Sequence, residues 1–435
     1  MRFAPHTDDE ISEMLATVDR ATLADLFTQI PENVRLDRAL DIPPGVSEME
    51  LLADMRALAS KNRHADELVC FAGGGAYDHF IPSVVWSLAG RSEFYTSYTP
   101  YQPELSQGVL QVLFEYQSMI CELTGLEVSN ASLYDGATAL VEAVHMTLEG
   151  GRRRVLVSSG VDRRAFEAIV TTGRGAGYVA EIFEGTPQVG PDTAAVVVQH
   201  PNVYGSLEPA RELFGLAHTG GARAIQLFDP LSLGVLAPPG ELGADIAVGE
   251  GQGLGNHLNY GGPYLGIIAA RMADVRRLPG RIVGETVDVD GRTGYVLTLQ
   301  AREQHIRREK ANSNICTNQT LMAVAATVYM GWLGRHGLVE LGRQCAAKAA
   351  YTAAALTALP GVSLRDPDRP FFKEFTLRLP MPAAAVIEAM VPHGFLAGIA
   401  VPEAGENVLV VAVTERRDRG EIDRYAVAMG QVLAS

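Results

Sequence analysis

The sequence predicts an α/β protein with a large, mainly parallel sheet, a small C-terminal α+β domain and an N-terminal helical arm. The first sixty residues carry short amphipathic helical patterns. After Gly150, short β-rich runs appear, several of them separated by helical or Gly/Pro-rich stretches. The C-terminal third combines strand-like and helical runs. We therefore expect an arm at 1–70, a large α/β domain at 71–320 and a small α+β domain at 321–435.

The arm is predicted from helix-start signals. Thr7 with Glu10, and Ser47 with Glu50, have the spacing of capping boxes. Apolar residues at helical spacing follow both, and a further set at 23–30 ends at Pro31. We expect three short amphipathic helices that pack on something larger.

The large sheet is predicted from runs that are apolar throughout. Alternation of apolar and polar residues is absent from them, as expected when helices cover both faces of a parallel sheet. A helical pattern at 105–124 precedes them. The predicted strands are 154–158, 179–183, 194–200, 224–228, 244–248 and 265–269.

The C-terminal domain begins with a long helical pattern from Gln319 through Trp332. Its uncharged segment is shorter than the ~20 residues that span a bilayer, so a buried helix is expected. The runs 375–379 and 408–413 predict strands, and 383–390 and 422–432 predict helices.

Composition argues against nucleic-acid and membrane partners. The net charge is −15, from 36 basic and 51 acidic residues, and an acidic surface repels polyanions. The N-terminus has no apolar signal core, and the four cysteines form no C-x-x-C pair. We expect reduced thiols and a cytoplasmic location.

Several common catalytic motifs are missing from the sequence. No H-x-x-x-H or H-E-x-x-H pattern supports a metal site, so none is expected. G-x-S-x-G and G-x-G-x-x-G are also absent. The polar segment 307–319 either caps the long helix that follows or lines a cleft, and both interpretations stay open.

The sheet does carry part of a pyridoxal-phosphate (PLP) pattern. In the large fold of PLP enzymes, an Asp at a strand end pairs with the pyridinium nitrogen, and a Lys past the next strand forms the Schiff base. Asp229 is suitably placed, but no lysine lies between Lys61 and Lys310. Gly136 and Thr138 open a helical segment that suits a phosphate, although any helix start looks similar.

The densest polar and aromatic segment is the loop at 94–104. It contains Tyr98, Tyr101, Gln102 and Glu104, and two prolines restrict its backbone. A preorganised functional site and a rigid structural loop that packs its rings on the core are both consistent with this composition.

These segments resemble the glycine decarboxylase P-proteins of the glycine cleavage system. The similarity runs from His6 to Glu415, and its motifs are long. It includes 98–108 (YTPYQPELSQG), 130–139, 249–252, 260–264 and 311–319. The resemblance implies a PLP-dependent transferase fold of type I. Some members of this family are single chains of about twice this length, and others are split into two homologous halves.

Gln252 marks which half this chain resembles. Counting back from Gly261, Gly262 and Pro263, the cofactor-binding half has its Schiff-base lysine where this chain has Gln252. The resemblance therefore implies an alpha subunit without PLP, in which Asp229, Gly136 and Thr138 are vestigial.

The resemblance also implies a reaction. The beta subunit of an α2β2 assembly would hold PLP and decarboxylate glycine, and the aminomethyl group would pass to the lipoyl group of H-protein, which is reduced. Tyr98, Tyr101, Gln102 and Glu104 would contribute to the partner's active site. Two alternatives are a degenerate scaffold or regulatory subunit and a free-standing PLP enzyme that uses an unexpected lysine.

Overall fold

The structure is a computed structural model that describes residues 5–36, 38–64, 67–311 and 314–435. The chain forms two compact units, Met1–Arg63 and His64–Ser435. Within the second unit, β1 (Val69–Cys70) pairs in parallel with β13 (Phe395–Leu396). The division of this unit into a large and a small domain at residue 320 stays a prediction.

The first unit contains the helices predicted for the arm. The capping boxes of α1 (Asp8–Thr17) and α2 (Glu48–Ala59) are both present. The pattern at 23–30 forms only a short 3-10 helix, Leu23–Phe27, and a second one follows at Glu32–Val34. Among the described residues of these helices, only Leu15 is buried, so little tertiary packing extends them.

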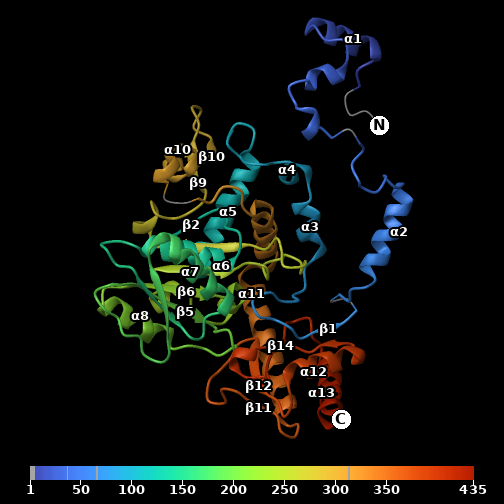
Figure 1. The fold of residues 1–435 in the computed structure, drawn as a ribbon. Helices are drawn as coiled ribbons and strands as arrows, with labels where there is room; N and C mark the ends of the chain where they lie inside the picture. The colour runs from blue at the N-terminus through green and yellow to red at the C-terminus, as the bar shows by residue number, and fades with distance from the viewer. Residues whose placement is uncertain (1–4, 37, 65–66, 312–313) are drawn as a thin grey trace. The chain divides into compact units, whose positions relative to one another are not determined.

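The second unit is built on a mostly parallel sheet. Among the described residues, this sheet has seven strands in the order β2-β8-β7-β6-β5-β3-β4, and β8 is antiparallel to both of its neighbours. Figure 1 labels β2, β5 and β6 of this sheet. The strands are β2 (Val128–Ser129), β3 (Arg154–Ser158), β4 (Val179–Phe183), β5 (Thr193–His200), β6 (Arg223–Phe228), β7 (Ile246–Glu250) and β8 (Gly266–Ala270).

Helices cover both faces of this sheet because successive strand residues point to opposite sides. On β7, Ala247 belongs to the core formed with α5 and α11. Its neighbours Ile246 and Val248 belong to the core formed with α6 and α7. The predicted apolar, doubly covered sheet is thus confirmed for its inner strands, whereas the edge strand β4 is largely exposed. The helices are α5 (Gln107–Thr124), α6 (Gly136–Thr147), α7 (Arg163–Ala176) and α11 (Thr320–Thr357).

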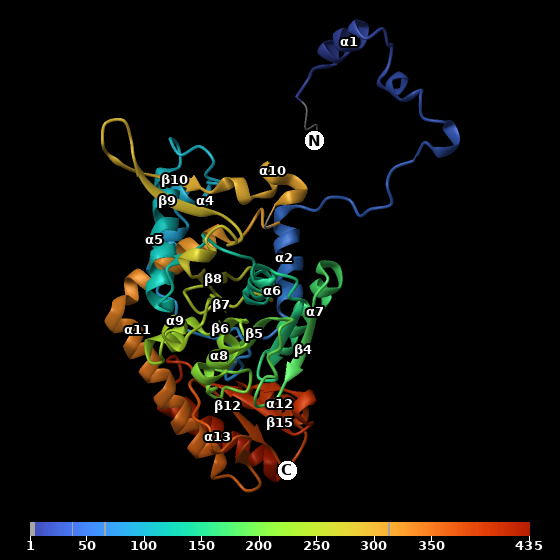
Figure 2. The same cartoon turned by 90° about the vertical axis from the view of Figure 1, so that its left-hand side faces the viewer.

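A second, antiparallel sheet has the strand order β11-β12-β15-β14. Helices α12 and α13 pack with it around their own core. Figures 1 and 2 show these orange and red elements grouped at one end of the second unit. The elements are β11 (Ser363–Leu364), β12 (Glu374–Arg378), α12 (Ala383–Met390), β14 (Ile399–Ala400), β15 (Val408–Ala412) and α13 (Arg419–Ala434).

Other details also differ from the sequence prediction. The strand predicted at 244–248 is shifted to Ile246–Glu250, since these residues are the ones whose backbone pairs with β6 and β8. The long helix continues past Trp332 to Thr357, with a kink at Gly334 (φ 58°). A hairpin of β9 (Ile282–Val287) and β10 (Thr293–Thr298) was not predicted, although both of its strands contain apolar residues, including the buried Ile282, Val283 and Leu297. None of the described helices is long and apolar enough to cross a bilayer.

Candidate functional site

A cleft with a volume of about 310 Å³ lies at the carboxyl ends of the parallel strands. Ligands of open α/β sheets bind at this edge, because loops and helix N-termini converge there. The start of β12 closes the cleft from the second sheet. Residues that line it include Gly74, Tyr77, Gly136, Arg164, Asp229, Glu250, Lys373 and Glu374.

An ion pair between Asp229 and Lys373 lies in this cleft. Asp229 follows β6, where its Oδ1 accepts a hydrogen bond from the backbone N–H of Leu231 at 3.1 Å. Its Oδ2 lies 2.7 Å from Nζ of Lys373. Lys373 is only 2% exposed. Its Nζ also lies 3.0 Å from Nε2 of His79 and 3.4 Å from the centroid of the Tyr77 ring. These contacts match the three N–H donors of an ammonium group.

The N-terminus of α6 holds the Glu250 carboxylate. The backbone N–H of Gly136 donates to Oε2 of Glu250 at 3.0 Å. The N–H groups of Gln252 and Leu265 donate to Oε1, also at 3.0 Å. Burial nevertheless raises the pKa of Glu250 to about 7. A helix N-terminus attracts anions, and here the anionic group belongs to the chain itself.

Thr138 serves the same helix as part of its cap. Its backbone N–H donates to Oδ1 of Asp135 at 2.8 Å, and its hydroxyl lies 3.0 Å from the same oxygen. The backbone N–H of Asp135 in turn donates to the Thr138 hydroxyl at 3.2 Å. These contacts form a capping box. The Thr138 hydroxyl is therefore engaged in holding the helix start.

Gln252 joins the sheet to the glycine-rich loop that precedes α3 (Ser83–Ala89). Its side chain is 1% exposed. Its Oε1 accepts a hydrogen bond from the backbone N–H of Tyr77 at 2.8 Å. Its Nε2 donates to the carbonyl oxygens of Tyr77 at 3.1 Å and Asn256 at 2.7 Å. Both ends of the amide are thus satisfied, which gives Gln252 a structural role.

Glu374 completes the wall beside Tyr77. It accepts hydrogen bonds from the Tyr77 hydroxyl at 2.8 Å and from the Gly74 backbone N–H at 2.7 Å. Burial raises the pKa of this carboxyl above its ordinary value. Gly74 adopts φ +77°, a conformation that favours glycine and places its N–H toward Glu374. The loop is therefore fixed at both Tyr77 and Gly74.

The cleft does not fit PLP in the way the fold would use it. The carboxylate that would bind the ring nitrogen, on Asp229, is already paired with Lys373. The helix N-terminus that would hold the phosphate already holds Glu250. The Gln252 amide cannot condense with an aldehyde. Lys373 cannot replace the Schiff-base lysine. It contacts Asp229, the residue that would bind the ring nitrogen of PLP, whereas the imine carbon lies on the opposite side of the ring.

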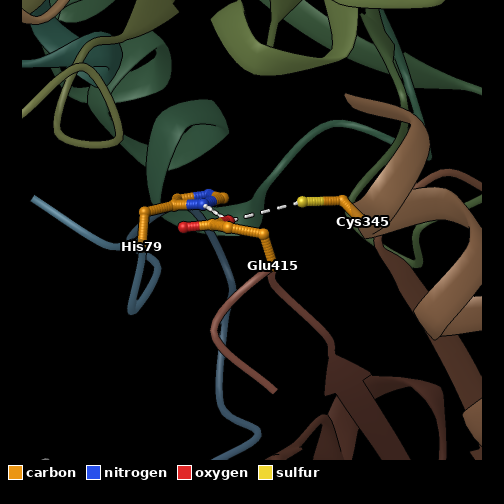
Figure 3. A group of neighbouring side chains, drawn as sticks. All are labelled: His79, Cys345 and Glu415. Carbon is orange, nitrogen blue, oxygen red and sulfur yellow. Dashed lines mark hydrogen bonds and ion pairs between the residues drawn. The ribbon is translucent and has the colours of Figure 1, made fainter. Parts of the chain in front are cut away.

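Three residues beside the cleft have side chains of the kinds that bind metals. His79, Cys345 and Glu415 bring their ligand atoms within 4.8 Å of one another (Figure 3). Nδ1 of His79 lies 2.6 Å from Oε2 of Glu415, and Sγ of Cys345 lies 3.6 Å from the same oxygen. The residues are far apart in sequence, so no motif indicated this group.

The chemistry of this group favours a hydrogen-bonded network over a metal centre. Burial and the Lys373 ammonium lower the pKa of His79, so its neutral ring donates from Nδ1 to Glu415 and accepts at Nε2 from Lys373. Burial opposes ionisation of Glu415, but hydrogen bonds from His79 and the Phe80 N–H hold its pKa below the ordinary value. Burial raises the pKa of Cys345 to about 12, which disfavours the thiolate that metals bind. The expectation of no metal site stays a prediction.

The tyrosine loop lies apart from the residues that line the cleft. Tyr98 is 79% exposed, and its hydroxyl lies 3.2 Å from the hydroxyl of Thr317. Tyr101 is 47% exposed, and its ring lies 5.6 Å from the His305 ring and 5.6 Å from the Arg281 guanidinium carbon. Gln102 and Glu104 are exposed. The loop does not bury its tyrosines in the core.

The predicted site residues therefore form two groups. Gly136 and Asp229 line the cleft, whereas Gln252 and Thr138 hold elements at its wall. Tyr98, Tyr101, Gln102 and Glu104 belong to the loop, and Tyr98 contacts Thr317 in the segment at 307–319. Asn312 and Ser313 of that segment lie outside the described residues.

Sequence reasoning missed Glu250 and Lys373. Lys373 is one of only four lysines and stands among Phe371, Phe372 and Phe375. A charged residue in such apolar surroundings is almost never fully buried unless it is paired, so this context was an available signal. Glu250 ends an apolar run and gave a similar but weaker indication.

Comparisons with known proteins agree with this fold. The family model described as Glycine cleavage system P-protein matches residues 1–428. A protein of Chlorobium limicola named probable glycine dehydrogenase (decarboxylating) subunit 1 is 49% identical over 441 residues, which cover 99% of both chains. A crystal structure of glycine decarboxylase (P-protein) of the glycine cleavage system, in inhibitor-bound form, is 46% identical with a TM-score of 0.93. It covers 99% of this chain and 100% of the other.

More distant structures share only the fold. A sphingosine-1-phosphate lyase of Burkholderia pseudomallei is 15% identical with a TM-score of 0.66, and it covers 93% of this chain and 95% of its own. The predicted fold class, the PLP-dependent transferase fold of type I, is confirmed. The family resemblance found in the sequence is confirmed by the match over nearly the whole chain. This chain belongs to the glycine cleavage system P-protein family.

Proposed function

We propose that this chain is the alpha subunit of a glycine dehydrogenase (aminomethyl-transferring, decarboxylating) and that PLP is bound by the beta subunit. The proposal rests on the position of Gln252 and on the hydrogen bonds of its side chain. Its amide stands at the position that the family pattern gives to the Schiff-base lysine, and both of its ends are used in hydrogen bonds. An amide cannot form the imine that this chemistry requires.

In the proposed complex, the beta subunit supplies PLP as the electron-withdrawing group while glycine loses CO2. The remaining aminomethyl group passes to the lipoyl group of H-protein, whose disulfide is reduced. The expected assembly is α2β2. The acidic composition and the four free cysteines support a cytoplasmic location for it.

The tyrosine loop is the part of this chain that we assign to the partner's active site or to the path of the lipoyl arm. Its tyrosine hydroxyls can orient a carboxylate or stabilise developing charge, and Glu104 can fix their geometry or move a proton. The exposure of Tyr98, Tyr101, Gln102 and Glu104 supports this role, because a structural loop would bury its rings.

We propose that the N-terminal arm packs against the beta subunit. In α2, the residues Leu51, Leu52, Met55 and Leu58 are each about half exposed. Covering apolar area of this kind stabilises an association by roughly 25 cal/mol per Å². The exposed face of α2 therefore supports a partner-binding arm.

Purification of the chain alone and with its beta partner tests the proposal. PLP content and the exchange of CO2 with the glycine carboxyl group are measured for both preparations. We expect both only when the beta subunit is present. PLP bound to the isolated chain through a lysine would instead support a free-standing enzyme. If substitutions in the tyrosine loop do not alter the activity of the complex, the scaffold alternative is supported.

A further inference from the structure

We propose that Lys373 and Glu250 occupy, within this chain, the places of the two charged ends of PLP. The cleft would then be a cofactor site that the protein's own side chains have closed. This inference rests on the proposed function, in which the beta subunit alone binds PLP. It assigns roles to two residues beyond the loss of the Schiff-base lysine.

Lys373 corresponds to the pyridinium end. A protonated pyridine nitrogen is a buried cation that donates to the aspartate at the strand end. The Lys373 ammonium is also a buried cation, and it lies 2.7 Å from Oδ2 of Asp229. It further faces the Tyr77 ring at 3.4 Å and lowers the pKa of nearby Glu374, which burial otherwise raises. Lys373 thus neutralises the Asp229 carboxylate, which would otherwise favour binding of a ligand cation.

Glu250 corresponds to the phosphate end. Phosphates bind at helix N-termini through backbone N–H groups, and the Gly136 N–H already donates to Glu250. A Cβ at Gly136 would lie 3.0 Å from the backbone N of Glu250 and 3.1 Å from its Cβ, so the two segments are in close contact. A phosphate at Gly136 would therefore meet the bulk of Glu250 and, above about pH 7, its negative charge as well.

One set of contacts links the two ends. The Gln252 backbone N–H donates to Glu250, and the Gln252 side chain holds Tyr77. The Tyr77 ring lies against Lys373, which pairs with Asp229. Changing Gln252 to lysine would supply an amine but would leave both internal charges in place. It would also put a second cation close to the first.

The test restores the features of a PLP site in steps. The variants Gln252→Lys, Gln252→Lys with Lys373→Met, and the triple variant with Glu250→Ala are incubated with PLP and reduced with borohydride. Peptide mass spectrometry then measures the fraction of chains modified at position 252, and fluorescence quenching gives the dissociation constant. Gln252→Lys with Lys348→Met is the matched control, because Lys348 contacts the Glu415 carbonyl oxygen and does not line the cleft.

We expect Gln252→Lys and the Lys348 control to show no specific modification at position 252. The triple variant should bind PLP at least about tenfold more tightly than Gln252→Lys, with the double variant between them. Equal binding by Gln252→Lys and the triple variant would overturn the proposal, as would a folded triple variant that does not bind. A Schiff base in the unaltered chain would instead contradict the proposed function.

A second variant covers the case in which the triple variant does not fold. Lys373→Ala leaves Asp229 without its cation and opens space for the missing side chain. Propylammonium should raise the melting temperature of this variant, whereas neutral 1-propanol, which has the same number of heavy atoms, should raise it much less. The unaltered chain should respond to neither compound. Equal responses to both compounds, or no response of Lys373→Ala, would show that the buried cation is not what this position requires.

Discussion

Replacing Glu250 by glutamine should change how the stability of the chain depends on pH. Burial raises the pKa of this carboxyl from the ordinary 4.5 to about 7 in the folded protein. Between these values the folded state holds a proton that the unfolded state releases, so stability falls as the pH rises. The full penalty above pH 7 is about 3 kcal/mol, since one pKa unit corresponds to about 1.4 kcal/mol.

The glutamine variant lacks this titration. It also leaves a poor match with the backbone N–H groups of Gly136, Gln252 and Leu265, which costs on the order of 1–3 kcal/mol at every pH. We therefore compare the free energies of unfolding of the variant and its parent. The informative quantity is how the difference between these two free energies changes with pH. That difference should move by about 2.5 kcal/mol in favour of Glu250→Gln from about pH 5 to about pH 8.

Differential scanning calorimetry of both proteins across this range measures the change. For a unit of this size, 1 kcal/mol shifts the melting temperature by ~1 °C, so a relative shift of about 3 °C is expected. Glu212→Gln on α8 (Ala210–Thr219) is the control, because it makes the same chemical change on an exposed surface. If the curves of Glu250→Gln and its parent stay parallel, the argument about the buried carboxyl is wrong.

Four further outcomes are expected. The isolated chain should form no borohydride-reducible imine with PLP, and a specific lysine adduct seen by mass spectrometry would contradict this. Deleting residues 1–31 should reduce co-purification with the beta subunit, and a full-size complex of equal melting temperature would exclude this part of the arm as the region that binds the partner. Tyr98→Phe or Tyr101→Phe should slow glycine decarboxylation in the intact complex by on the order of 10²–10³, whereas normal turnover in both would remove the hydroxyls from the site. Lys373→Met should lower the stability measured by calorimetry by about 3–5 kcal/mol, because it leaves a buried carboxylate unpaired, and a neutral effect would refute the buried pair.

Local patterns in the sequence were enough to predict most elements of the fold. The strands Arg154–Ser158 and Val179–Phe183 and the helix Ala383–Met390 have the predicted bounds, because their apolar residues and flanking breakers act over short distances. The capping boxes at Thr7 and Ser47 are also local. The hairpin at Ile282–Thr298 was missed, although Asp290-Gly291 between two partly apolar runs is a local hairpin signal.

By itself, the sequence determined the fold class and the family, and it located the break in the cofactor pattern at Gln252. Each of these depends on neighbouring residues or on a long motif. Only the tertiary structure showed which side chains occupy the cleft in which the fold would otherwise hold PLP. Lys373 lies 144 positions after Asp229 and Glu250 lies 114 positions after Gly136, yet both pairs are in contact. The sheet and the loops at its carboxyl edge bring these charges together, and their burial makes the pairing obligatory.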